Sequence, residues 1–230
     1  MKLFIFLLTF IFTLSSFAQK KADIGIFVGG AYYQGDINHA RLFYHVNPSY
    51  GILYRFNLNT RFAFRGNLII SSLSGSDKDF TYDYQTYRNW KFSTPLVDIS
   101  GQTEFNFKKY HVGKKKYPHT PYVFLGLSFI IASYAQNPYV IGIPFGLGYK
   151  QNIGKRIGIG VEWGYRKTFS DDIDNLSGER LYPSIVTSPS QKFSLKQRGN
   201  FRNTDWYSIF GVFITYKLSP GRTACYIYND

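Results

Sequence analysis

The sequence predicts an all-β fold, an antiparallel transmembrane β-barrel of about eight strands with a plugged interior. Two observations lead to this prediction. The first is residues 141–174, where two runs of strictly alternating side chains flank a polar turn at 151–156 that contains Asn152 and Gly154. Because side chains alternate between the two faces of a strand, this segment is predicted to be one hairpin. The second is an aromatic content of 20%, which is typical of the interfacial girdles of a membrane barrel.

The two faces of this hairpin indicate which side would meet lipid. One face of its second run is apolar and holds Ile157, Ile159, Val161, Trp163 and Tyr165. The other face of the hairpin carries repeated glycine with isolated Lys150, Glu162 and Arg166. A soluble sandwich would place polar side chains along its wet face. Glycine with a few charges instead suits the crowded inside of a small closed barrel, so the apolar face would meet lipid.

A secretory signal peptide is expected over residues 1–18. A basic residue precedes an apolar run at 3–14, and Ala18 is the small residue at the expected cleavage site. The apolar run is too short for a membrane-spanning helix. We therefore divide the chain into this signal peptide, an outer-membrane β-barrel over 19–218 and a periplasmic C-terminal tail over 219–230.

The formal net charge of +13 bears on the partners of the chain. The expected signal peptide would direct the chain out of the cytoplasm, which argues against nucleic acid as a partner. Membrane lipid with anionic headgroups or an acidic protein is therefore the expected partner. The single cysteine, Cys225, cannot form an internal disulfide, and we assign it no role.

The other strands follow from the same alternation. The predicted strands are 23–33, 49–58, 62–71, 90–107, 122–133, 141–150, 157–166 and 206–218. Strand 122–133 is apolar on both faces, so its facing stays open. An even strand number is typical of single-chain bacterial outer-membrane barrels, in which short turns face the periplasm and long loops face outside. The turns at 59–60 and 151–156 are short, whereas the loops at 75–89 and 168–205 are long.

Charged side chains of both signs fall on inward-facing positions. They are Arg55, Arg65 and Arg166 against Asp98, Glu104 and Glu162. An eight-stranded barrel is just wide enough for its side chains to fill it, and an unpaired charge there would cost several kcal/mol. We therefore predict a mutually satisfied ion-pair plug rather than a proton or solute path.

A long basic connection is expected on the side of the short turns. It contains Lys108, Lys109, Lys114, Lys115 and Lys116, with His111 and His119. Such a cluster is either a solvated turn or a docking surface for a periplasmic partner or anionic lipid. Because it breaks the short-turn rule of the barrel, it is the candidate docking site.

Other polar clusters do not fit an enzyme or metal site. The acidic run 170–175 lacks the central glycine and the distant glutamate of a calcium loop at the required positions. The four histidines have no serine or cysteine partner at a recognisable spacing. We expect no metal, no cofactor and no catalytic residue.

Six short motifs, in order along the chain, resemble one known family. They lie at 32–38 (YYQGDIN), 65–75, 104–107 (EFNF), 121–124 (PYVF), 143–146 (IPFG) and 162–169 (EWGYRKTF). The ordered set resembles the PorG family, an outer-membrane barrel component of the type IX secretion system of Bacteroidota. The resemblance implies a non-enzymatic secretion component in a Gram-negative outer membrane. It also implies association with a periplasmic ring built from a PorK-like lipoprotein and its PorN-like partner. The alternative is a small outer-membrane pore or a surface-binding barrel that uses the 168–205 loop.

Overall fold

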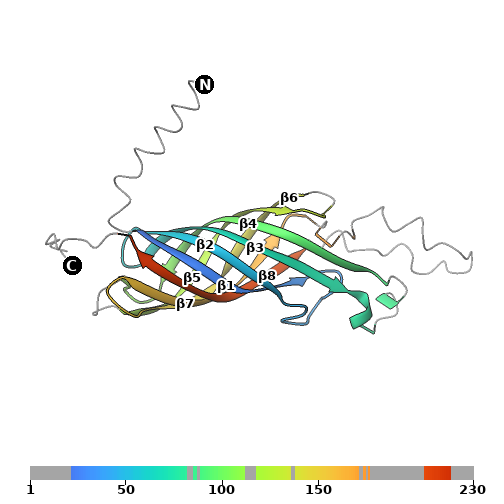
Figure 1. Cartoon of the computed structure of the whole chain (residues 1–230), viewed down its shortest axis with the longest axis horizontal. Helices are drawn as coiled ribbons and strands as arrows, with labels where there is room; N and C mark the ends of the chain where they lie inside the picture. Colours follow the sequence, from blue (N-terminus) through green and yellow to red (C-terminus); the bar gives the residue numbers. More distant parts are fainter. Residues whose placement is uncertain are drawn as a thin grey trace, which may run out of the picture.

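In the part of the chain that the structure describes, eight antiparallel strands pair in sequence order. The first strand also pairs with the last, which closes the sheet into a barrel (Figure 1). The strands are β1 (Ala22–Gln34), β2 (Asn47–Asn57), β3 (Phe62–Ser76), β4 (Lys91–Asn106), β5 (His119–Ala132), β6 (Tyr139–Asn152), β7 (Ile157–Thr168) and β8 (Trp206–Lys217), with a short 3-10 helix, η1 (Asp77–Asp79), after β3. The predicted fold class, a closed antiparallel barrel of eight strands, is confirmed.

The computed structural model describes residues 22–81, 85–86, 89–111, 118–135, 138–170, 173–174, 176 and 205–218. Within these residues, no helix is long and apolar enough to span a membrane. The predicted signal peptide and the C-terminal tail with Cys225 lie outside them.

The two ends of the barrel differ in their connections. At the turn end, on the left in Figure 1, β2 joins β3 through residues 58–61 and β6 joins β7 through residues 153–156. The longer β4–β5 connection, residues 107–118, lies at the same end. The opposite end, which we call the loop end, holds the β1–β2, β3–β4, β5–β6 and β7–β8 connections. The prediction of the loop 75–89 is shifted slightly, since β3 continues to Ser76 before η1 begins.

The outer wall of the barrel is apolar, as the alternation predicts. Ile52 and Phe64 are exposed on this wall, and their sequence neighbours Leu53 and Ala63 point inward and are buried. A strand with this pattern can lie at a lipid surface with one face and against a packed interior with the other.

The structure settles the facing of β5, which the sequence left open. Leu125 and Leu127 are exposed on the outer wall, whereas Tyr122, Phe124 and Ile130 point inward and are buried. Large rings can therefore occupy the interior beside β6, where the facing positions are glycines.

Glycine on the inner face of β6 and β7 leaves room for these rings. A Cβ atom added at Gly148 would lie within 2.7 Å of ring atoms of Tyr122. One added at Gly160 would overlap the ring of Phe213 from β8. The repeated glycines therefore form an inner surface without side chains, which we call the glycine wall, and interior aromatic side chains pack against it.

Candidate functional site

All six charged residues predicted to face inward are buried inside the barrel. The sequence did not determine which cation would contact which carboxylate. The side chains separate into two groups, one nearer the turn end and one nearer the loop end. Each group includes side chains from strands that are distant in sequence but whose inward faces meet in the closed barrel.

The larger group, which we call the Glu104 cluster, consists of Arg55, Arg65, Glu104, Lys150 and Glu162. The Nε atom of Arg55 donates a hydrogen bond to Glu104 Oε1 over 3.0 Å, and Arg65 Nη1 lies 3.1 Å from the same oxygen. Lys150 Nζ donates to Glu104 Oε2. Arg65 also donates to Glu162 Oε2, so Arg65 links the two glutamates.

The second group, the Asp98 cluster, lies nearer the loop end. Arg166 Nε donates to Asp98 Oδ2 over 3.1 Å. The hydroxyl of Tyr207 donates to the same carboxylate oxygen over 3.0 Å. Asp98 and Arg166 are both fully buried, so each neutralises the other away from water.

Lys150 is a member of the interior that sequence reasoning did not include among the paired charges. Its position on the inward face of the hairpin was the available signal. Asp23, whose carboxylate accepts from Asn57 Nδ2 over 2.9 Å, was also missed. With both included, the buried charged side chains of β1–β8 are four cations and four carboxylates: Arg55, Arg65, Lys150, Arg166, Asp23, Asp98, Glu104 and Glu162. Their formal charges sum to zero.

Aromatic rings occupy the space between the Glu104 cluster and the glycine wall. The guanidinium of Arg55 lies 5.2 Å from the ring centroid of Phe213. The Nζ atom of Lys150 lies 4.6 Å from the ring of Tyr122. Cations over aromatic faces are attracted by the ring quadrupole, and the attraction is stronger in a desolvated site. The rings therefore fill the barrel and also stabilise its buried cations.

Tyr110 covers the interior at the turn end. It comes from the β4–β5 connection, is buried, and donates its hydroxyl proton to Asn152 Oδ1 over 2.8 Å. Its backbone N–H donates to Thr60 O over 3.0 Å, which ties the connection to the β2–β3 turn. Burial raises the pKa of the Tyr110 hydroxyl, so this group stays a neutral donor. Lys150 Nζ lies 5.1 Å from the Tyr110 ring on its inner side.

The basic connection predicted as a docking surface is only partly within the described residues. Lys108 and Lys109 are exposed, and the backbone N–H of Lys108 donates to Thr120 Oγ1 over 3.0 Å. Lys114, Lys115 and Lys116 lie outside the described residues. The connection therefore begins from a fixed base at the mouth of the barrel.

Charge is distributed unequally between the two ends. The turn end carries further exposed cations on neighbouring turns, namely Arg61, Lys155 and Arg156. Among the carboxylates of the described residues, Asp79 is the one that is exposed, and it lies at the loop end. The described surface of the turn end is therefore cationic without an exposed carboxylate.

The described part of the 168–205 loop packs against the loop end of the barrel. Ile173 and Leu176 are buried, and Thr94 Oγ1 donates to Ile173 O over 2.9 Å. Asp174, from the acidic run, is buried and accepts a hydrogen bond from the Tyr33 hydroxyl over 2.7 Å. Asp171 and Asp172 lie outside the described residues. No group of three or more His, Cys, Asp or Glu side chains that could hold a metal is found in the described part of the chain.

Comparison with solved structures finds similar chains. Neisserial surface protein A has a TM-score of 0.51 and 11% sequence identity, covering 85% of this chain and 96% of that chain. The N-terminal β-barrel domain of Pseudomonas aeruginosa OprF gives 0.43 and 12%, covering 86% and 98%. The attachment invasion locus protein Ail of Yersinia pestis gives 0.44 and 11%, covering 86% and 98%. At 11% identity the likeness to Neisserial surface protein A concerns the fold alone, that of an eight-stranded outer-membrane barrel.

Sequence comparison identifies the family. No curated protein matches this chain. A family model described as a domain of unknown function, DUF6089, matches residues 1–229. The chain therefore belongs to the DUF6089 family.

Proposed function

We propose that this chain is a non-enzymatic outer-membrane barrel of the type IX secretion system that anchors a periplasmic lipoprotein ring to the outer membrane. The observation that carries the proposal is the cationic turn end, with Arg61, Lys108, Lys109, Lys155 and Arg156 exposed and no exposed carboxylate among the described residues there. Such a surface attracts an acidic partner. The resemblance to the PorG family gives the partner its identity, a PorK-like lipoprotein with a PorN-like protein.

The orientation of the barrel follows from its connections. In outer-membrane barrels short turns face the periplasm, so the turn end would lie on the side of the ring. The β4–β5 connection is the long exception on that side. Tyr110 anchors it through hydrogen bonds to Thr60 and Asn152. A fixed base reduces the conformational entropy that its lysines would lose on binding.

The interior supports an anchor rather than a conduit. The Glu104 and Asp98 clusters, together with rings such as Phe213 and Tyr122, occupy a barrel of the size that side chains fill. A pore would need a continuous water-filled path, and the paired charges and the rings take up that space. The surface-binding alternative depends on the 168–205 loop, most of which lies outside the described residues.

Charge reversal tests the docking surface. Changing Lys108, Lys109, Lys114, Lys115 and Lys116 to Glu should leave insertion intact, because this connection lies outside the lipid-facing strands. Recovery of the ring lipoprotein from solubilised membranes should fall, as should secretion of type IX cargo. The control for position reverses two lysines, Lys78 and Lys91, which are exposed at the loop end; this variant should keep both recovery and secretion. A reversed connection that still recovers the ring and secretes at the wild-type level would refute the docking assignment.

A further inference from the structure

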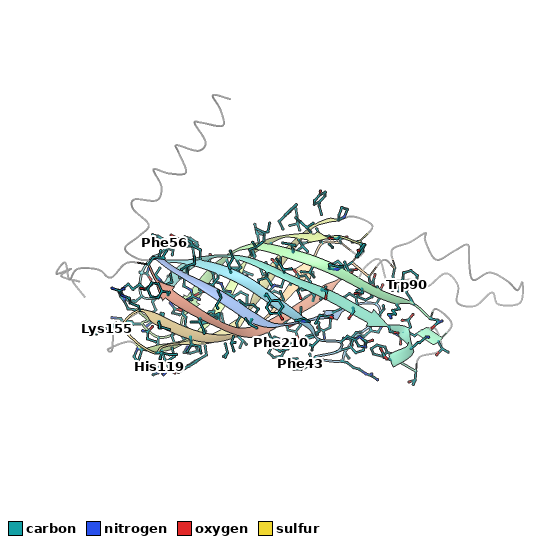
Figure 2. The ribbon with its side chains drawn as sticks, viewed as in Figure 1. Phe43, Phe56, Trp90, His119, Lys155 and Phe210 are labelled. Atoms are coloured by element: carbon teal, nitrogen blue, oxygen red, sulfur yellow. The ribbon has the colours of Figure 1, made fainter. Side chains whose placement is uncertain are left out.

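The β1–β2 connection, residues 35–46, folds back from the loop end onto the outer wall of the barrel. Phe43 lies beside Phe210 on the outer wall (Figure 2), with ring centroids 4.9 Å apart. Its ring is also 5.4 Å from that of Tyr32 and 6.0 Å from that of Trp163. Tyr32 faces outward in the alternation of β1 yet is fully buried, because Phe43 covers it.

These side chains form a cluster across the line where the barrel closes. Tyr32 belongs to β1, Phe210 to β8 and Trp163 to β7. Ser208 lies between the larger side chains on β8 and accepts a hydrogen bond from Trp163 Nε1 over 2.8 Å. We call Tyr32, Phe43, Trp163, Ser208 and Phe210 the seam cluster. A loop residue thus contacts three strands that meet at the closure of the sheet.

The backbone of the loop is held in an unfavourable conformation to achieve this. Phe43 has φ of 57° and His45 has φ of 44°, the left-handed region that non-glycine residues rarely adopt. Such conformations persist when surrounding contacts determine them, and they cluster at functional segments. In this conformation the Phe43 ring lies against the outer wall, whereas the neighbouring Tyr44 hydroxyl contacts Ser76 and Asp79 in the β3–η1 region.

Polar contacts fix the opposite side of the loop to the β3–η1 region. The hydroxyl of Tyr44 lies 2.6 Å from Asp79 Oδ2, and His45 Nε2 lies 3.0 Å from the same oxygen. Arg41 Nη1 donates to Asp79 O over 3.0 Å. The loop is therefore amphipathic, with its polar side toward η1 and its apolar side along the outer wall.

The apolar side of the loop is open to its surroundings. Leu42 and Phe43 are each 51% exposed and Val46 is 43% exposed. These three side chains continue the apolar outer wall, which on β1 includes Ile26 and Val28 nearer the turn end. Exposed apolar side chains continuous with a lipid-facing surface are expected in contact with lipid.

Strand geometry allows the outward-facing side chains of β1, up to Tyr32, to lie within the apolar band of a membrane. A strand that rises about 3.3 Å per residue and tilts about 40° advances roughly 2.5 Å per residue along the barrel axis. Ile24 to Tyr32 therefore spans about 20 Å, inside an apolar band about 25 Å tall. Phe43 contacts Tyr32 and so lies at the level of the loop-end leaflet.

We propose that residues 41–46 form an interfacial clasp whose Leu42, Phe43 and Val46 side chains insert among the acyl chains of the loop-end leaflet. The occupant of this surface is membrane lipid, because the surface is continuous with the lipid-facing wall. The clasp ties the β1–β8 closure to the membrane boundary. This inference does not depend on the proposed secretion role.

Site-directed spin labelling tests the clasp in purified full-length barrel inserted into phosphatidylcholine vesicles. Cys225→Ser removes the single native cysteine, and Leu42→Cys introduces the labelled site. Collision with oxygen, which concentrates in lipid, is compared with collision with a water-soluble nickel chelate. Leu125→Cys on the outer wall is the lipid reference, and Lys78→Cys at the exposed loop end is the water reference. Heat-modifiable migration in gels verifies that each variant is folded.

The proposal expects the label at Leu42 to resemble the lipid reference, with several-fold greater access to oxygen than to the nickel chelate relative to Lys78→Cys. A label that resembles the water reference would overturn the proposal. So would a label shielded from both reagents, which would indicate that protein, such as a second copy of the chain, covers the surface. A second variant, Phe43→Ser, should move a label at Leu42 toward the water reference, whereas Phe43→Leu should leave it in lipid.

Discussion

Removing the charge of Glu104 is the sharpest test of the barrel interior. This carboxylate contacts three cations: Arg55 Nε at 3.0 Å, Arg65 Nη1 at 3.1 Å, and Lys150. Glu104→Gln preserves the volume and a hydrogen-bond acceptor, so its main effect is electrostatic. The buried formal charge of the strands would change from zero to +1. Breaking a buried pair by removing one partner costs about 3–5 kcal/mol, and we expect a loss of unfolding free energy in that range.

A second substitution then separates charge imbalance from lost contacts. Lys150→Met in the Glu104→Gln background removes one cation and returns the buried formal charge to zero. Met retains much of the volume and apolar stem that Lys150 packs against Tyr122. The double variant should therefore be more stable than the sum of the single effects predicts, by about 1–3 kcal/mol, as expected for residues in direct contact.

The measurement is reversible urea unfolding in phosphatidylcholine vesicles, followed by tryptophan fluorescence. The control replaces Lys150→Met with Lys167→Met, which removes an equal charge from the outer wall, where Lys167 lies over the ring of Trp206. Glu104→Gln and Lys167→Met should be additive. If Glu104→Gln and Lys150→Met are also additive, the Glu104 cluster is not a coupled network and the reasoning fails.

Further outcomes follow from the packing of the wall and the mouth. Leu125→Arg, on the lipid face of β5, should destabilise the barrel by about 2–4 kcal/mol in vesicle unfolding. Gly160→Ala should cost about 1–3 kcal/mol through crowding against Phe213; in a Phe213→Leu background the same change should cost less, and Gly101→Ala, which meets open space, should be neutral. Planar-bilayer recordings should show no steady ohmic conductance for the wild type or for Tyr110→Ala, since the Glu104 cluster closes the barrel below Tyr110. Recovery of the ring lipoprotein should fall as salt rises above physiological strength, where the Debye length is already about 8 Å.

The barrel was predictable because a strand has a period of two residues and a closed barrel has two chemically distinct faces. The alternation of Ile157–Tyr165 with glycine and charge fixed both the strand and its facing. The facing of β5 was not predictable, because apolar side chains suit both lipid and a packed interior. Tyr122 and Phe124 face inward because glycines on β6 leave them space, and that depends on the neighbouring strand.

The sequence predicted which charged side chains face the interior, but it did not predict which of them contact each other. Parity placed Arg166 and Asp98 on the inner face, but their contact joins β7 to β4 across the barrel. Strand tilt and stagger decide which inward residues lie at the same height along the barrel axis. Neither can be read from the sequence of a single strand. Lys150 has the same parity as Glu162, so its place in the interior was predictable from the sequence.

The predicted strands 23–33 and 49–58 leave the β1–β2 connection as a loop, but its position on the outer wall was not predictable. Local sequence suggests a loop through Gly35, Asp36 and Asn38. Two sets of tertiary contacts hold the loop on the outer wall. Phe43 contacts β7 and β8, near the other end of the chain, and Tyr44 contacts η1. An apolar pair, Leu42 and Phe43, within a predicted loop was the available hint.

The buried charged side chains of β1–β8 balance one another, and this affects how the exposed cations of the turn end are interpreted. Because the buried side chains of the strands sum to zero, the exposed cations of the turn end are not counterions for the interior. Within the described residues these cations are held by water and by neutral acceptors, as where Arg156 donates to the Tyr216 hydroxyl over 2.9 Å, so they remain available to an acidic partner. Lys155 and Arg156 lie on a short turn close to the membrane boundary, where lipid headgroups can accept them. Lys108 and Lys109 belong instead to a longer connection whose base is hydrogen-bonded to Thr60, Thr120 and Asn152. A cationic connection whose two ends are fixed in this way is better suited to an acidic protein surface than to the membrane plane.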